Sequence, residues 1–340
     1  MRSMKQYSIL LFVLLTGGFC TAQTSYPADL FVAQDGSAQY TTIQEAVNAV
    51  RDLSQQQVRI HIKKGIYHEK LIIPSWKTKI ALIGEDRENT VITNGDYSGK
   101  PNPSGKDLFG RAQYSTYTSY TVLVQGNDFV AENLTIINSS GRVGQAVALH
   151  VEGDRCIIRN CTLSGNQDTL YAATENSRQL YDSCYISGTT DFIFGEATAV
   201  FRNCTINSLT DSYITAAATT PRQQYGFVFI QCKLTAEPGV TKVFLGRPWR
   251  AYAKTVFINT MMGSHIIPEG WNPWKGDLMF PEKEKTAYYA EYNNSGPGAS
   301  VAHRVAWAKQ LTLAEANTYT VLSILAGKDN WQPLPTLQQP

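Results

Sequence analysis

Short segments in which apolar and polar residues alternate recur through the middle of the chain. Four of them place a cysteine at the same position and follow it with a polar and then an apolar residue. Successive copies start 27, 23, 20 and 28 residues apart, which is the length of a structural repeat rather than of a domain. The copies occupy residues 133–136, where leucine replaces the cysteine, and residues 160–163, 183–186, 203–206 and 231–234.

This alternation is typical of half-buried β-strands, and no convincing amphipathic helix interrupts the repeat. Short strands that repeat every 20 to 28 residues without crossover helices indicate coils that stack on one another. We therefore expect an all-β fold, a single-stranded right-handed parallel β-helix with short terminal helices and long side loops.

The cysteines of the repeat are expected to form a ladder inside this β-helix. Such a ladder is compatible with metal or redox chemistry, but buried thiols also behave as small apolar side chains, and we favour this structural interpretation. We expect Cys161, Cys184, Cys204 and Cys232 to be buried in register without disulfides among them. Because the chain has no Cys-x-x-Cys pair and its five histidines are scattered, the sequence predicts no metal site.

An open β-helix needs a cover at each end, and the pattern changes there. Residues 42–51 have helical periodicity, and residues 313–325 predict a second helix near the other end. Residues 268–297 are rich in Pro, Trp, Gly and Asn, which predicts a long loop packed on the side of the β-helix.

The first residues have the pattern of a secretory signal peptide. Arg2 and Lys5 precede an apolar run over residues 9–15, and small residues lead to Ala22. The apolar run is too short for a transmembrane anchor, which needs about 20 residues.

We therefore expect residues 1–22 to be a cleaved signal peptide and residues 23–340 to form one catalytic β-helix domain. A lipoprotein signal at Cys20 is an alternative, but the bulky Phe19 before it fits that processing poorly. The expected location is secreted or periplasmic, with no membrane span, and the protein is expected to be a monomer.

Charge limits the partners of the mature chain. Cleavage removes two of the 30 basic residues and none of the 28 acidic ones, so 28 of each remain. A net charge near zero disfavours nucleic-acid binding, and a polyanionic partner must be held by local groups in a cleft.

Three polar residues follow the repeat in a way that predicts chemistry. Gln145, Asp168 and Asp191 are spaced 23 and 23 residues apart, and stacked coils lie about 4.8 Å apart, so their side chains are expected in one row. Two carboxylates at that distance cannot both ionise freely, and such a pair can provide an acid/base and a nucleophile. The structural alternative is that stacked acids only cap turns, and Asp211, also seven residues after a ladder cysteine, cautions against spacing alone.

At these residues the chain resembles the pectin methylesterase family. Five family signatures occur in order, a specific combination, and the resemblance extends over roughly residues 28–332. The signatures are Gly-Ile-Tyr-His-Glu at 65–69, Gln-Ala-Val-Ala-Leu at 145–149, Gln-Asp-Thr-Leu-Tyr at 167–171, Asp-Phe-Ile-Phe-Gly at 191–195 and Leu-Gly-Arg-Pro-Trp at 245–249.

The resemblance implies a role for each catalytic residue. Asp191 would attack the methyl-ester carbonyl of pectin, and Asp168 would protonate the departing methanol and then activate water. Gln145 would donate to the oxyanion, with Gln167 as helper, and Arg247 would hold Asp191 ionised and oriented. No metal or other cofactor is implied.

The resemblance also implies residues that contact the substrate, besides Gln145 and Arg247. Tyr171, Phe194 and Trp249 match positions that line the cleft, and Thr121 matches a contacting threonine. Glu69 lies several coils from the aspartates, so we expect it to be structural.

Three other functions remain compatible with the residues. A pectate lyase on the same fold would need clustered carboxylates for calcium and a basic side chain beside them, whereas this chain offers amides. A retaining glycosidase also uses carboxylates about 5 Å apart. A non-catalytic protein that binds polygalacturonan would need only the coils.

Overall fold

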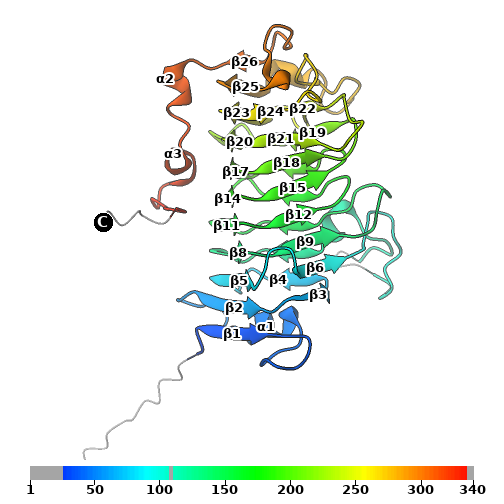
Figure 1. The fold of residues 1–340 in the computed structure, drawn as a ribbon, viewed down its shortest axis with the longest axis vertical. Helices are drawn as coiled ribbons and strands as arrows, with labels where there is room; N and C mark the ends of the chain where they lie inside the picture. Colours follow the sequence, from blue (N-terminus) through cyan, green and yellow to red (C-terminus); the bar gives the residue numbers. More distant parts are fainter. Residues whose placement is uncertain (1–25, 107–109, 335–340) are drawn as a thin grey trace, which may run out of the picture.

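The computed structural model describes residues 26–106 and 110–334, so the predicted signal peptide lies outside the described residues. The chain winds into a right-handed parallel β-helix in which three parallel sheets run along a common axis, as Figure 1 shows. Each of the central coils adds one strand to each sheet, so residues one coil apart in the sequence become neighbours across strands. The predicted fold class is confirmed.

The first sheet has 11 strands and the second has eight. In spatial order the first contains β1 (Asp29–Val32), β2 (Val58–Ile62), β5 (Ile80–Gly84), β8 (Val130–Glu132), β11 (Cys156–Arg159), β14 (Arg178–Asp182), β17 (Thr198–Arg202), β20 (Phe227–Ile230), β23 (Lys254–Ile258), β25 (Tyr288–Tyr292) and β26 (Lys309–Gln310). The second contains β3 (Gly65–His68), β6 (Thr90–Asn94), β9 (Thr135–Asn138), β12 (Thr162–Ser164), β15 (Tyr185–Gly188), β18 (Thr205–Ser208), β21 (Lys233–Ala236) and β24 (Met261–Met262).

The third sheet has seven strands and carries the candidate site. It contains β4 (Leu71–Ile73), β7 (Val122–Val124), β10 (Leu149–Val151), β13 (Leu170–Ala172), β16 (Ile193–Gly195), β19 (Tyr213–Ala217) and β22 (Phe244–Pro248). The helical segments are α1 (Ile43–Ala49), α2 (Leu313–Ala316), α3 (Val321–Leu325) and the 3-10 turns η1 (Thr116–Thr118), η2 (Lys283–Lys285) and η3 (Pro297–Ala299).

The cysteine ladder forms as predicted. The residues after the cysteines pair in register from β12 through β21, which stacks the cysteines themselves one coil apart. All of them are buried and free of disulfides. Burial raises the pKa of the Cys161 thiol well above its usual range, so the ladder contributes apolar packing rather than reactive thiolates.

The residue before each ladder cysteine explains why polar side chains recur there. Asn160, Ser183, Asn203 and Gln231 all have a left-handed backbone, with φ between 47° and 57°. This conformation turns the chain from the first sheet into the second, and asparagine adopts it more readily than most residues. Asn160 also donates a hydrogen bond of 2.7 Å from Nδ2 to Oδ1 of Asn133 in the preceding coil.

The predicted N-terminal helix is α1, and Glu69 supports it. Thr42 and Glu45 form a capping box at its start. Both carboxylate oxygens of Glu69 accept backbone hydrogen bonds from this helix, from Ile43 at 2.8 Å and Gln44 at 2.9 Å. The predicted structural role of Glu69 is therefore confirmed.

The single helix predicted over residues 313–325 is wrong. Two short helices, α2 and α3, form instead, and they run alongside the 11-stranded sheet (Figure 1) rather than capping the last coil. Val321, Ile324 and Leu325 pack in one apolar cluster with outward-facing residues of that sheet, such as Leu180 and Val200. Those outward-facing apolar residues need a segment that covers them. The pattern within residues 313–325 does not show that this segment is the one that covers them.

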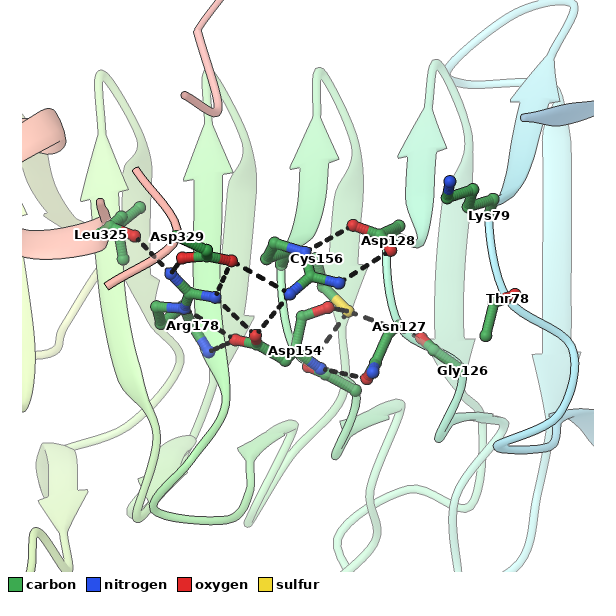
Figure 2. Close-up of polar contacts among 12 residues, drawn as sticks. Thr78, Lys79, Gly126, Asn127, Asp128, Asp154, Cys156, Arg178, Leu325 and Asp329 are labelled. Carbon is green, nitrogen blue, oxygen red and sulfur yellow. Dashed lines mark hydrogen bonds and ion pairs between the residues drawn. The ribbon is translucent and has the colours of Figure 1, made fainter. Parts of the chain in front are cut away.

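Ion pairs fasten the end of this segment to the sheet, as Figure 2 shows. Asp329 accepts a hydrogen bond of 2.9 Å from Nη2 of Arg178 on β14. Arg178 in turn donates from Nε to Asp154 at 2.9 Å and from Nη1 to the carbonyl of Leu325 at 3.2 Å.

The long loop predicted over residues 268–297 is only partly correct. β25 lies within it and pairs in parallel with β23, so the first sheet continues through this segment. The five residues of β25, Tyr-Tyr-Ala-Glu-Tyr, do not alternate apolar and polar side chains, and they are too short a signal to outweigh the composition of the segment. In the ranges described, no helix is long and apolar enough to cross a bilayer.

Candidate active site

A cavity of about 340 Å³ opens on the outer face of the seven-stranded sheet. Seven of the residues that the sequence singled out line it together, from four different coils. They are Gln145, Gln167, Asp168, Asp191, Phe194, Arg247 and Trp249.

The two aspartates occupy equivalent places in neighbouring coils. Asp168 lies two residues before β13 and Asp191 two residues before β16, and Leu170 pairs with Ile193 between these strands. Both aspartates have a left-handed backbone, with φ of 66° and 50°. Such conformations in non-glycine residues are uncommon and often mark functional sites.

Gln145 is not in register with Asp168, contrary to the expectation from the equal spacing. Gln145 forms a bridge with Gln167, and a few residues later Leu149 pairs with Leu170. This coil is therefore 21 to 22 residues long in its register, not 23. The amides of Gln145 and Gln167, from adjacent coils, therefore line the cavity together with the two carboxyls.

Arg247 reaches Asp191 from β22 and binds both of its carboxylate oxygens. Nε donates to Oδ1 at 3.0 Å and Nη2 to Oδ2 at 2.6 Å, a bidentate pair. Between the two strands lies Ala216 on β19, whose small side chain leaves room for the guanidinium. The residue before Arg247 must be glycine, because a Cβ on Gly246 would lie 1.9 Å from Oγ1 of Thr215.

The electrostatic surroundings separate the two carboxyls. Burial raises the pKa of Asp168 well above its usual range, and the charge of Asp191 raises it further. Burial also raises the pKa of Asp191, but the hydrogen bonds and charge of Arg247 oppose this. Asp191 therefore ionises at lower pH than Asp168. We expected Arg247 to hold Asp191 ionised, but the effect of burial on the pKa of Asp191 is larger than the opposing effect of Arg247.

Aromatic rings form one wall of the cavity. Phe194 stacks on Tyr171 with 4.5 Å between ring centroids, and Trp249 contacts Phe194 edge-on at 5.8 Å. Tyr171 itself does not line this cavity. It lines a neighbouring hollow of about 300 Å³ and donates from its hydroxyl to Glu196 at 3.2 Å.

Thr121 differs from its expected role as a substrate contact. Its side chain is fully buried, and its hydroxyl donates to the carbonyl of Ile137 at 2.8 Å. The hydroxyl therefore joins the residue before β7 to β9 beneath the surface, and Thr121 does not line the cavity.

Asp211 shows what the same spacing does elsewhere. Its exposed carboxylate accepts backbone hydrogen bonds from Thr241 at 2.7 Å and Lys242 at 2.9 Å. It therefore caps a turn, as the structural alternative for stacked acids anticipated, and lies outside the cavity.

Four residues of the cavity were missed from the sequence. Thr116 and Tyr117 come from η1, and Trp274 comes from the loop before β25. Trp274 packs over Arg247, with the guanidinium carbon 3.6 Å from its ring centroid, and Ala216 completes the floor. The only available signal was the abundance of Trp and Pro in residues 268–297.

In the described part of the chain, no three His, Cys, Asp or Glu side chains come together in a way that could hold a metal ion. The polar side chains that line the cavity include two carboxyls with different surroundings, one guanidinium and two amides.

Comparison with solved structures matches this architecture. A pectin methylesterase from carrot superposes with a TM-score of 0.79 at 34% identity, covering 91% of this chain and 96% of its own. The pectin methylesterase PemA from Erwinia chrysanthemi gives a TM-score of 0.76 at 30% identity, with 90% and 98% covered.

Sequence comparison leads to the same group. Pectinesterase 2 from Citrus sinensis is 38% identical over 327 residues, which cover 92% of this chain and 60% of the relative. A probable pectinesterase/pectinesterase inhibitor from Arabidopsis thaliana is 37% identical over 327 residues, which cover 92% of this chain and 46% of the relative. The chain therefore spans about half the length of such plant relatives. A family model for pectinesterases matches residues 29–328, and this chain belongs to the pectinesterase family.

Proposed function

We propose that this protein is a pectin methylesterase that hydrolyses methyl esters of polygalacturonate to pectate and methanol. One observation supports this most strongly: two buried carboxyls face one cavity, and an arginine binds only one of them. Family membership supports the ester as substrate, and a related pectin methylesterase at 30% identity has been solved in complex with a hexasaccharide.

The proposed reaction has two half-reactions that use the same two aspartates. Ionised Asp191 attacks the ester carbonyl carbon, and the bond to the methoxy oxygen breaks as protonated Asp168 gives it a proton, releasing methanol. Asp168, now ionised, then takes a proton from water, whose oxygen attacks the Asp191 acyl group and frees the galacturonate. The pKa order of Asp168 above Asp191 provides the starting state that this sequence needs.

Charge develops on the carbonyl oxygen in each half-reaction. Gln145 and Gln167 line the cavity beside the aspartates and are our candidates for the oxyanion donors. Loss of one such donor typically costs about 3 kcal/mol of transition-state stabilisation. Arg247 orients Asp191 and favours its ionised form.

The substrate would lie against the aromatic wall. Phe194, Trp249 and Trp274 line the cavity, and flat apolar faces beside polar groups suit sugar rings. Tyr171 is our candidate for a contact in the neighbouring hollow. We further propose export through cleavage of residues 1–22 and action as a monomer.

The decisive experiment measures methanol and new reducing ends together on highly methylated pectin with a chelator present. Methanol release without new reducing ends is expected, because the proposed reaction cleaves the ester and leaves the glycosidic bonds intact. The chelator should not reduce it, because the proposed charge stabilisation uses only side chains of the protein. New reducing ends would favour a glycosidase. Loss of activity that calcium restores would favour a lyase.

Arg247→Lys is expected to lower kcat/KM for methanol release by about tenfold to a hundredfold. An ammonium cannot reproduce the two parallel hydrogen bonds to Asp191 or the packing on Trp274. The measurement is the initial rate on methylated pectin, with thermal unfolding to confirm a folded variant. Near wild-type kinetics would show that the bidentate contact is unimportant.

A further inference from the structure

Lys283 in η2 is a buried lysine beside the cavity, although it does not line it. Its side chain is only 1% exposed. The ammonium donates to Oδ2 of Asp277 at 2.6 Å and to the carbonyl of Trp249 at 3.5 Å, and it lies 4.4 Å from the ring centroid of Trp274. One ammonium therefore contacts Asp277 and two residues of the cavity wall, Trp249 and Trp274, which come from different segments of the chain.

We propose that Lys283 and Asp277 form a positioning pair that holds Trp249 and Trp274 against the catalytic residues. This role rests on the esterase function proposed above and extends it to residues that touch neither substrate nor reacting atoms. Trp274 packs on Arg247 at 3.6 Å, and Arg247 binds Asp191. The wall and the nucleophile are thus linked through contacts that begin at Lys283.

The cost of burying an ammonium supports a specific role for this residue. A lysine is rarely fully buried unless it is paired, because its charge loses hydration. Here a carboxylate, a carbonyl and an aromatic face replace water around the charge. Burial still lowers the pKa of Lys283, and Arg247 and Arg250 lower it further, while Asp277 opposes this.

Asp277 organises the other side of the pair. Its Oδ1 accepts backbone hydrogen bonds from Met279 at 3.0 Å and Phe280 at 3.2 Å, so it shapes the loop tip while Oδ2 binds Lys283. Removal of the ammonium is expected to release the loop that carries Trp274, since the carboxylate would lose its cationic partner.

The charge of Lys283 also acts on the nucleophile at longer range. Asp191 is faced by Arg247, Asp168 and the buried Tyr289, and Lys283 contributes positive charge that favours the ionised carboxylate. Lys283→Met removes that charge while it keeps most of the apolar stem. The acid limb of the activity profile is therefore expected to move to higher pH.

The test compares Lys283→Met with Lys285→Met as a matched control. Lys285 lies two residues away and pairs with Glu282 at 2.6 Å, but both side chains are well exposed, at 65% and 63%. Lys283→Met is expected to lower kcat/KM for methanol release by about tenfold to a hundredfold and to move the acid limb upward. Lys285→Met should match wild type in both. Asp277→Asn should lower kcat/KM without the upward shift, because it keeps the ammonium.

A second readout does not need activity. Iodide quenching of tryptophan fluorescence should increase in Lys283→Met but not in Lys285→Met, and the increase should disappear when both carry Trp274→Phe. Equal quenching and equal pH profiles for the two lysine variants would overturn the positioning role. If the unmodified protein releases no methanol, the proposed function fails, and the quenching comparison still decides whether Lys283 positions Trp274.

Discussion

Asp191→Ala is expected to abolish methanol release, with a loss of about ten-thousandfold or more in kcat. The substitution removes the carboxylate that Arg247 orients in the cavity and leaves Asp168, whose raised pKa favours the protonated form, which does not attack an ester carbon. Substrate binding should persist, because the aromatic wall and the amides remain in place. Methanol release under single-turnover conditions, together with binding of methylated oligogalacturonides, measures both effects.

Asp211→Ala is the matched control. Asp211 occupies the same place after a ladder cysteine as Asp168 and Asp191, but it is exposed and binds only backbone N–H groups. Its removal should leave kcat unchanged. Because Asp191→Ala leaves the Arg247 guanidinium without its carboxylate, Asp191→Asn serves as a second variant with less disturbance. Substantial methanol release by both folded Asp191 variants would show that Asp191 is not the nucleophile.

Asp168→Asn is expected to turn over at least about a hundredfold more slowly while it still binds pectin. An amide cannot protonate the methoxy oxygen, and it cannot take a proton from water in the second half-reaction. Initial rates of methanol release and a direct binding measurement separate the two effects. Near wild-type turnover would show that another group supplies the proton.

The same variant should change stability in a way that depends on pH. The pKa of Asp168 is raised in the folded protein, whereas an unfolded aspartate titrates near about 3.9. The folded state therefore holds its proton more tightly, and wild-type stability falls as pH rises from about 4 through the raised pKa. Asparagine carries no charge, so Asp168→Asn should gain stability relative to wild type over that range. Urea unfolding at pH 4 and pH 8 tests this, and an equal difference at both would contradict it.

The local sequence determined the repeating architecture of this protein. A polar residue that accepts a left-handed backbone, followed by cysteine, recurs where successive coils pass from the first sheet into the second, as at Asn160 and Cys161. Because a β-helix pairs each coil with the next, a period in the sequence becomes a row in space. The spacing of Asp168 and Asp191 therefore predicted correctly that they are neighbours, and the family signatures pointed to Arg247 as the partner of Asp191.

Only the tertiary structure decided the register of individual coils and the positions of the segments that pack on the outside of the β-helix. The register of Gln145 depends on how a coil of different length closes, which its own residues do not reveal. The places of α3, Trp274 and Lys283 depend on surfaces made by distant coils, such as the outward residues of the first sheet or the backbone of Trp249. Short-range patterns determine strands and turns because their causes are local, whereas these segments are placed by burial and charge pairing across the whole fold.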